Sequence, residues 1–178
     1  RGLGDVYKRQ VFGQLIYGPL SDRVGRVKPL YFGMTLYVIA SLICATTDSE
    51  YVLFAARTLQ ALGACVGAVV TRAAIRDTLP PRQMAKAFSI MVLVMGLAPI
   101  LAPSMGAAFL HFFDWHAIFW FLAGFGVLNL LLTKFFFKET LTDENRNTQP
   151  LNTIFSQYVS LLKDPSFGYP AIGAGLLM

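Results

Sequence analysis

Four long stretches with almost no charge constrain the fold of this chain more than any other feature. Residues 29–47, 87–113 and 115–133 are charge-free windows of 19, 27 and 19 residues, and the 21 residues 51–71 carry a single charge, Arg57. A helix needs about 20 apolar residues to cross a hydrocarbon core about 30 Å thick. The sequence therefore predicts four transmembrane helices, over about 29–47, 51–71, 87–110 and 115–133.

The composition agrees with a membrane protein. Hydrophobic residues make up 55% of the chain and charged residues 14%, where a soluble domain carries about 25% charged residues. Lipid admits only helices and closed barrels, and barrel strands alternate in polarity, which these windows do not. We therefore expect an all-α helical bundle with the lipid bilayer as its partner. The net charge of +5 does not indicate nucleic-acid binding, because no basic face on a soluble fold is predicted.

The charges between the windows predict the orientation. Alternate loops differ sharply: "TDSE" (47–50) and "HFFDWH" (111–116) contain no Lys or Arg, whereas the other three connecting segments contain eleven. Lys and Arg concentrate on the cytoplasmic side of membrane proteins, so these three segments are predicted to be cytoplasmic. Their cations are Arg23, Arg26, Lys28, Arg72, Arg76, Arg82, Lys86, Lys134, Lys138, Arg146 and Lys163.

The two ends of the chain look incomplete. We expect residues 1–10 to be non-native or an artefact, because their charges lie where the first half of a span would be. A transmembrane bundle is expected over 11–137, followed by a cytoplasmic connector over 138–164 with an amphipathic surface helix. Residues 165–178 are interpreted as the start of a further span. The chain is thus expected to be a fragment.

The segment before the first full span combines charges, glycine and proline. Gly18 and Pro19 are expected to end a helix, Gly25 to supply a turn, and Pro29 to fit the first turn of the next helix. Asp22 lies among cations, so it should stay ionised and cap a helix or pair with a cation. Taken alone, the segment is explained as well by a loop facing anionic lipid. The residues that form its pattern are Gly18, Leu20, Asp22, Arg23, Gly25, Arg26 and Lys28.

Arg57 lies six positions inside its predicted span, at a depth of about 9 Å. It shares a helix face with Gln60, Ala64 and Gly67, which favours a position in a bundle interior or a wet cavity. The alternative is an arginine that extends its side chain to the outer interface. Asn129 is the other strongly polar side chain within the spans.

Pro99 and Pro103 lie on one face of the third predicted span, and each removes a backbone donor. We expect the helix to bend there. Gly96 and Gly106 would permit close helix packing. A kinked helix with a purely structural role explains this segment about as well as a functional one.

These three segments, in their order along the chain, resemble motifs of the major facilitator superfamily of transporters. The resemblance covers residues 11 to about 138. The first segment resembles the family's signature loop, Gly-x-Leu-x-Asp-Arg-x-Gly-Arg-x-Lys, between helices 2 and 3. The resemblance implies a gate latch formed by Asp22 with Arg26. "RTLQALGA" (57–64) resembles the helix 4 motif Arg-x-x-Gln-Gly-x-Gly, with Ala61 in place of one glycine. It implies that Arg57 takes part in proton coupling by shifting the pKa of a carboxylate.

"GLAPILAPSMGA" (96–107) resembles the helix 5 motif of proton-driven antiporters, Gly-x-x-x-Gly-Pro-x-x-Gly-Gly. Pro103 and Gly106 are in register, and alanines stand at the other glycine positions, 98, 102 and 107. The double proline and "GQLIYGPLSDRVGR" are closer to the Bcr/CflA drug-efflux branch. On this resemblance the full spans are helices 3 to 6 of the family.

The resemblance implies a proton-coupled multidrug antiporter with alternating access in the bacterial inner membrane. Its ligands would be protons and small amphipathic drugs or metabolites, it would need no cofactor beyond the proton gradient, and we expect a monomer. We identify neither catalytic residues nor a metal site. No acid lies within the predicted spans, so the resemblance implies a proton acceptor on the family's helix 1. A sugar or amino-acid transporter, or an inactive truncated fragment, are the alternatives.

Overall fold

The computed structural model describes residues 17–137 and 139–141, and every regular element among them is a helix. Residues 17–24 are helical, so the expectation that Gly18 and Pro19 end this helix is wrong: both lie inside it, and it ends before Gly25. Four longer helices follow: α2 (Val27–Thr46), α3 (Glu50–Thr78), α4 (Pro81–Phe112) and α5 (His116–Phe136). The expected all-α fold is confirmed. The expectations for residues 1–10, for the surface helix and for the span starting near 165 lie outside the described residues.

Local sequence explains where the helices begin and end. Gly25 has φ +98°, a value that glycine adopts without steric cost, and it separates the first helix from α2. α3 ends at Thr78 because Pro80 restricts Leu79 to an extended conformation, and Leu79 has φ −110° and ψ 140°. Pro81 then begins α4, at the position where its missing N–H costs nothing.

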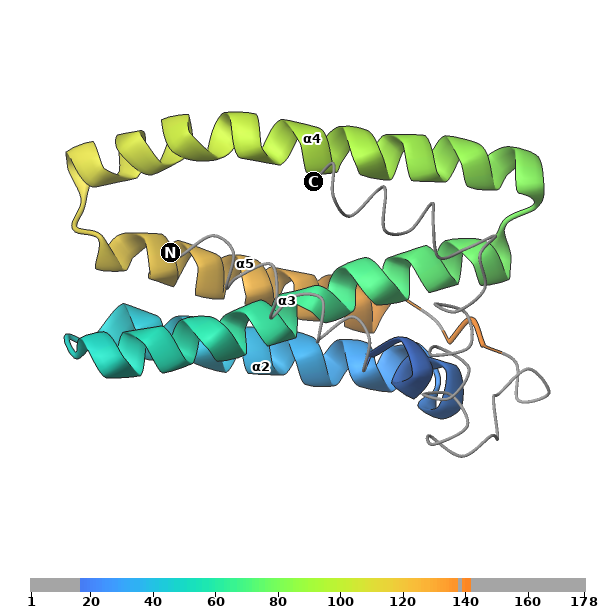
Figure 1. The fold of residues 1–178 in the computed structure, drawn as a ribbon, viewed down its shortest axis with the longest axis horizontal. Helices are drawn as coiled ribbons and strands as arrows, with labels where there is room; N and C mark the ends of the chain where they lie inside the picture. Colours follow the sequence, from blue (N-terminus) through green and yellow to red (C-terminus); the bar gives the residue numbers. More distant parts are fainter. Residues whose placement is uncertain (1–16, 138, 142–178) are drawn as a thin grey trace, which may run out of the picture. The chain divides into compact units, whose positions relative to one another are not determined.

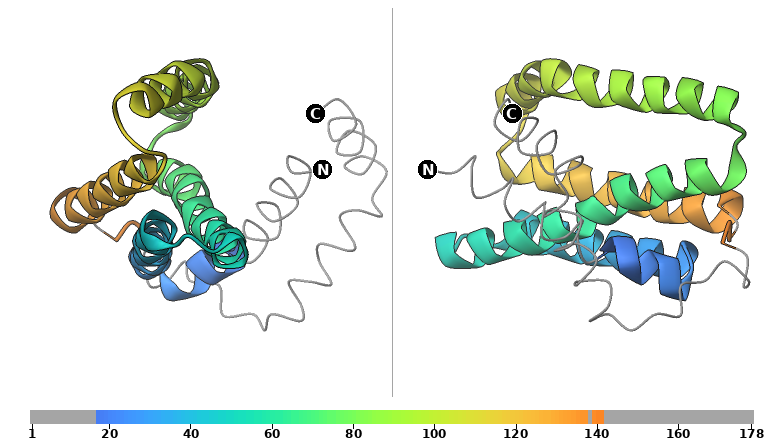
Figure 2. Two further views of the ribbon diagram at one scale, coloured as in Figure 1. Left: turned by 90° about the vertical axis from the view of Figure 1, so that its left-hand side faces the viewer. Right: turned by 45° about the vertical axis from the view of Figure 1, so that its right-hand side comes forward.

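α2 packs against both α3 and α5 (Figures 1 and 2). Glycines allow the backbones to approach closely. A Cβ added to Gly63 would lie 2.6 Å from the carbonyl oxygen of Gly33 and 2.7 Å from the amide nitrogen of Tyr37. A Cβ on Gly126 of α5 would lie 2.7 Å from a methyl group of Val38. These three helices therefore form one tightly packed unit.

Two small apolar clusters hold this unit together. The first joins the residue 17–24 helix, α2 and α3 through Tyr17, Leu30, Cys65, Val66 and Val70. The second joins α2, α3 and α5 through Cys44, Ala45, Ala56 and Phe119.

α4 is placed differently, since none of its residues is buried. It runs as one gently bowed helix that is separate from the other three along most of its length (Figure 1). Pro99 and Pro103 lie inside it without ending it.

All four helices are long and apolar enough to cross a membrane. Each overlaps one of the four predicted spans, and α3, α4 and α5 extend beyond the predicted bounds at the ends that carry Arg or Lys. Many large apolar side chains are exposed in the structure, among them Phe32, Ile100 and Phe135. In a multi-pass membrane protein such side chains face lipid or neighbouring helices.

Candidate functional site

Arg26 is the centre of a polar cluster at the end of the unit where α2 begins and α3 ends. Only 6% of this residue is exposed. Its Nε donates to Asp77 Oδ2 at 2.9 Å, and its Nη1 donates to Ser21 Oγ at 2.8 Å and also to Asp22 Oδ1. We call Ser21, Asp22, Arg26, Asp77 and Glu139 the latch cluster.

The latch cluster neutralises the buried positive charge of Arg26. Burial acts to lower the pKa of Arg26, but the hydrogen bonds and charges of Asp77 and Asp22 outweigh it, so this pKa is raised above its ordinary value. Buried charges are tolerated when they are paired and hydrogen-bonded in this way. The first helix, α2 and α3 are thus tied together by one guanidinium group.

Glu139 joins the cluster from the segment that follows α5. Its Oε1 accepts from the backbone N–H of Arg26 at 2.8 Å, and its Oε2 accepts from that of Val27 at 3.2 Å. These N–H groups belong to the N-terminus of α2, where a negative charge is favoured. Burial acts to raise the pKa of Glu139, but the backbone hydrogen bonds outweigh it, and the pKa is lowered.

Gly25 is required by this arrangement. A Cβ at this position would lie 2.5 Å from Glu139 Oε2, and the positive φ would strain any other residue. The other predicted latch residues are more peripheral. The carbonyl of Gly18 accepts from Ser21 Oγ at 2.8 Å, while Arg23 and Lys28 form no ion pair within the described part of the chain.

The structure thus brings the predicted pair Asp22 and Arg26 together, and it adds three partners that the sequence analysis missed. Asp77 carries a signal in hindsight, because it is the only acid between Arg72 and Lys86. Glu139 follows the last span at the same predicted side of the membrane. Neither the motif nor helix periodicity identifies them as partners of Arg26.

Arg57 belongs to a second polar cluster, where α3 meets α2 and α5. Arg57 itself is exposed in the structure, so the expected position in a bundle interior is not seen among the described residues. Its Nη1 donates to Gln60 Oε1 at 3.1 Å, and its guanidinium carbon lies 4.8 Å from the centre of the Phe119 ring. The buried Gln60 in turn donates from Nε2 to Ser41 Oγ at 2.7 Å. We call Ser41, Arg57, Gln60 and Phe119 the membrane polar cluster. It joins the predicted pair Arg57 and Gln60 to α2 and α5.

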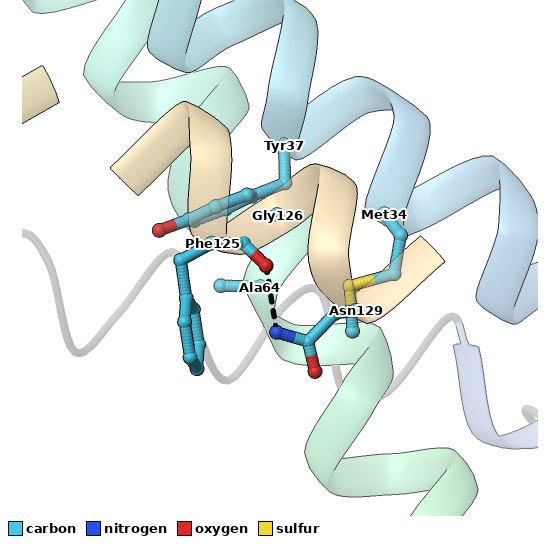
Figure 3. Close-up of a pocket in the computed structure, with 6 residues that line it drawn as sticks. All are labelled: Met34, Tyr37, Ala64, Phe125, Gly126 and Asn129. Atoms are coloured by element: carbon cyan, nitrogen blue, oxygen red, sulfur yellow. Dashed lines mark hydrogen bonds between the residues drawn. The ribbon is translucent and has the colours of Figure 1, made fainter. Parts of the chain in front are cut away.

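A cavity of about 220 Å³ lies between α2, α3 and α5 (Figure 3). Its wall is mostly apolar, and Asn129 adds an amide that donates from Nδ2 to the carbonyl of Phe125 at 2.8 Å. This space is smaller than a typical small-molecule site, which has a volume of about 300–1,000 Å³. The residues that line it are Met34, Tyr37, Ala64, Phe125, Gly126 and Asn129.

The predicted motif on α4 is in neither cluster. A Cβ added to Gly96 or Gly106 would meet no other atom within 4 Å, so neither glycine serves a close helix contact among the described residues. Pro99 and Pro103 are exposed. The described residues also contain no group of His, Cys, Asp and Glu side chains that could hold a metal ion.

Comparison with known proteins gives consistent results. Residues 10–178 match the sequence profile of the Major Facilitator Superfamily. The chain is 41% identical over 167 residues to "Uncharacterized MFS-type transporter YdgK" of Bacillus subtilis, covering 93% of this chain and 42% of the relative. It is 37% identical over 126 residues to "Multidrug resistance protein MdtL" of Escherichia coli, covering 71% of this chain and 32% of the relative.

A solved structure shares the fold. The crystal structure of the human organic anion transporter MFSD10 superposes with a TM-score of 0.70 at 21% identity, over 79% of this chain and 32% of that chain. The chain spans less than half the length of these relatives. Their family and names place it with transporters rather than with enzymes.

Proposed function

Because this chain belongs to the Major Facilitator Superfamily, we propose that it is part of a proton-coupled multidrug efflux antiporter. The protein works by alternating access in a bacterial inner membrane, as a monomer, and belongs to the Bcr/CflA branch. The similarity to a protein named for multidrug resistance supports drug efflux. The membrane polar cluster supports proton coupling, and it is the observation that carries the proposal.

A cation inside a membrane is energetically costly. Arginine remains charged under all ordinary conditions, and a charge at the centre of a bilayer costs at least about 2.5–3.5 kcal/mol. Arg57 lies about 9 Å inside its predicted span, short of the centre, and it is exposed on α3. Its partners Gln60 and Phe119 are both uncharged. A permanent charge held by neutral groups lowers the pKa of a nearby carboxyl group and makes it release its proton.

The carboxyl group that accepts the proton lies elsewhere in the protein. Among the described residues, acids occur only in loops and at helix ends: Asp22, Asp48, Glu50, Asp77, Asp114 and Glu139. On the resemblance given above, we assign the acceptor to an aspartate on the helix that corresponds to helix 1 of the family. Binding of a drug near Arg57 would then compete with binding of the proton.

The latch cluster gates this exchange. Arg26 and its acidic partners hold the first helix, α2 and α3 in one arrangement, and they lie at the end predicted to be cytoplasmic. The cluster stabilises one of the two conformations of the transport cycle, and its opening accompanies the other. On the resemblance given above, Pro99, Pro103, Gly96 and Gly106 form the antiporter motif of α4.

The proposal is tested with the full-length protein in proteoliposomes that contain a pH-sensitive dye. Addition of ethidium or chloramphenicol should move protons in the direction opposite to the drug, whereas sugars and amino acids should not. Arg57→Ala should abolish the exchange, and Arg82→Ala, which removes an exposed cation outside both clusters, should not. Proton movement driven only by a sugar or an amino acid would instead indicate a metabolite transporter.

A further inference from the structure

We propose that Ser41 on α2 and Phe119 on α5 are positioning residues for Arg57. This inference rests on the proposed function, in which the place of the Arg57 charge determines proton release. Neither residue belongs to the motif that contains Arg57 and Gln60, and each lies on a different helix from that motif.

Ser41 fixes the direction of the Gln60 amide. The Ser41 hydroxyl donates its only proton to the carbonyl of Tyr37 at 2.7 Å, so toward Gln60 the oxygen can only accept. Gln60 must therefore point Nε2 at Ser41, where the distance is 2.7 Å. Its Oε1 consequently faces Arg57 and accepts from Nη1 at 3.1 Å. If the amide turned over, its NH₂ group would face Arg57, which can only donate, and the bond to Arg57 would be lost.

Phe119 supports the guanidinium group from α5. Its ring centre lies 4.8 Å from the guanidinium carbon, within the roughly 6 Å over which a cation is attracted to a ring. Only 6% of Phe119 is exposed. The ring is itself held by Trp115, which packs edge-on with centres 5.9 Å apart.

Together the two residues make the position of the charge depend on all three packed helices. Arg57 is bound on one side through Gln60 and Ser41 to α2, and on the other side to α5. The effect of a charge on the pKa of a neighbour changes with distance. A displacement of the guanidinium after loss of either contact therefore weakens proton release without removing the charge.

The geometry is tested by NMR of ¹⁵N-labelled arginine side chains in the full-length protein in lipid nanodiscs. The signal that disappears in the Arg57→Lys variant is assigned to Arg57. Phe119→Met, which removes the ring but keeps much of the volume, should move this signal, and Phe119→Trp should keep it close to its original position. Ser41→Ala should increase the rate of guanidinium rotation, and Ser41→Thr should not. Phe135→Met, at an exposed position near the end of the same helix, is the control and should leave the Arg57 signal unchanged.

Transport supplies a second readout. Ser41→Ala and Phe119→Met should each reduce ethidium-driven proton exchange by about tenfold or more, and Ser41→Thr and Phe119→Trp should restore most of it. In an Arg57→Lys background the same two substitutions should have no additional effect, because they act through the guanidinium group. An additive loss would show a merely structural role and overturn the inference.

Different results would contradict the proposed function and the positioning of Arg57. If the wild-type protein exchanges no protons for any drug, the proposed function is wrong, while the NMR comparison still tests the positioning of Arg57. An Arg57 signal that is the same in Ser41→Ala, Phe119→Met and the wild type overturns the inference whatever the transport result.

Discussion

Replacing Asp77 by asparagine tests the latch cluster most directly. Asp77 is the ion-pair partner that α3 contributes to Arg26, at 2.9 Å, and the side chains of Arg26 and Asp77 are 7% and 22% exposed. A hydrogen bond to a charged group contributes about 1.5–3 kcal/mol. The asparagine side chain keeps an oxygen acceptor but loses the charge, and Asp22 remains to neutralise Arg26. We therefore expect Asp77→Asn to destabilise the latched arrangement by about 2 kcal/mol, which corresponds to about a thirtyfold shift in equilibrium.

The free energy of unfolding is measured by titration with SDS in mixed micelles, on the full-length protein. Asp48→Asn is the matched control, because the Asp48 side chain is 94% exposed and its contact with His116 spans 3.6 Å. This control should cost less than about 0.5 kcal/mol. Once Arg26→Met has removed the buried charge, Asp77→Asn should cost much less than it does alone. Equal losses for Asp77→Asn and Asp48→Asn, or full additivity with Arg26→Met, would refute the reasoning.

Three further predictions concern the latch and the helix packing. Asp22→Asn should slow turnover of drug exchange but leave drug binding intact, and loss of binding in an equilibrium assay would contradict a latch role. The pKa of Glu139 is lowered below its ordinary 4.5, so its stabilising effect should be complete above that value and decline as the pH falls through the lowered pKa. Glu139→Gln should remove this decline from a stability-versus-pH curve measured in micelles, and an unchanged curve would count against the contact. Gly63→Ala should destabilise α2–α3 packing by about 1–3 kcal/mol, whereas Gly124→Ala, whose added Cβ meets nothing within 4 Å, should be nearly neutral in the same SDS titration.

The helical fold could be predicted from the sequence because hydrocarbon imposes a simple rule on length and charge. Charge-free windows are necessary for spans, and Pro80 and Pro81 mark a helix boundary without reference to the rest of the fold. The packing of the helices could not be predicted in this way. Nothing in the pattern around Gly33 and Gly63 indicates that their backbones touch, since small residues permit a close approach without specifying the partner.

The same limit applies to the candidate sites. Asp22 and Arg26 are four residues apart, so their pairing follows from local sequence. Asp77 and Glu139 reach Arg26 across 51 and 113 residues of chain, and such contacts depend on how whole helices are arranged. The pair Arg57 and Gln60 is local and was predicted, whereas Ser41 and Phe119 come from other helices and were found only in the structure.

Both polar clusters connect α2 to α3. The packing of these two helices therefore determines how one cluster can influence the other. Arg57 and Asp77 are 20 residues apart on α3, which is about 30 Å of helix. Between them, Gly63 meets the backbone of α2 so closely that even a methyl group would clash. Two helices in such contact move as one body more readily than they slide past each other. A change in charge near Arg57 would therefore reach the latch cluster as a tilt of the α2–α3 pair. The membrane polar cluster also contacts α5 through Phe119, and the latch cluster also contacts the chain after α5 through Glu139. A tilt of the α2–α3 pair would therefore strain or release contacts in both clusters together.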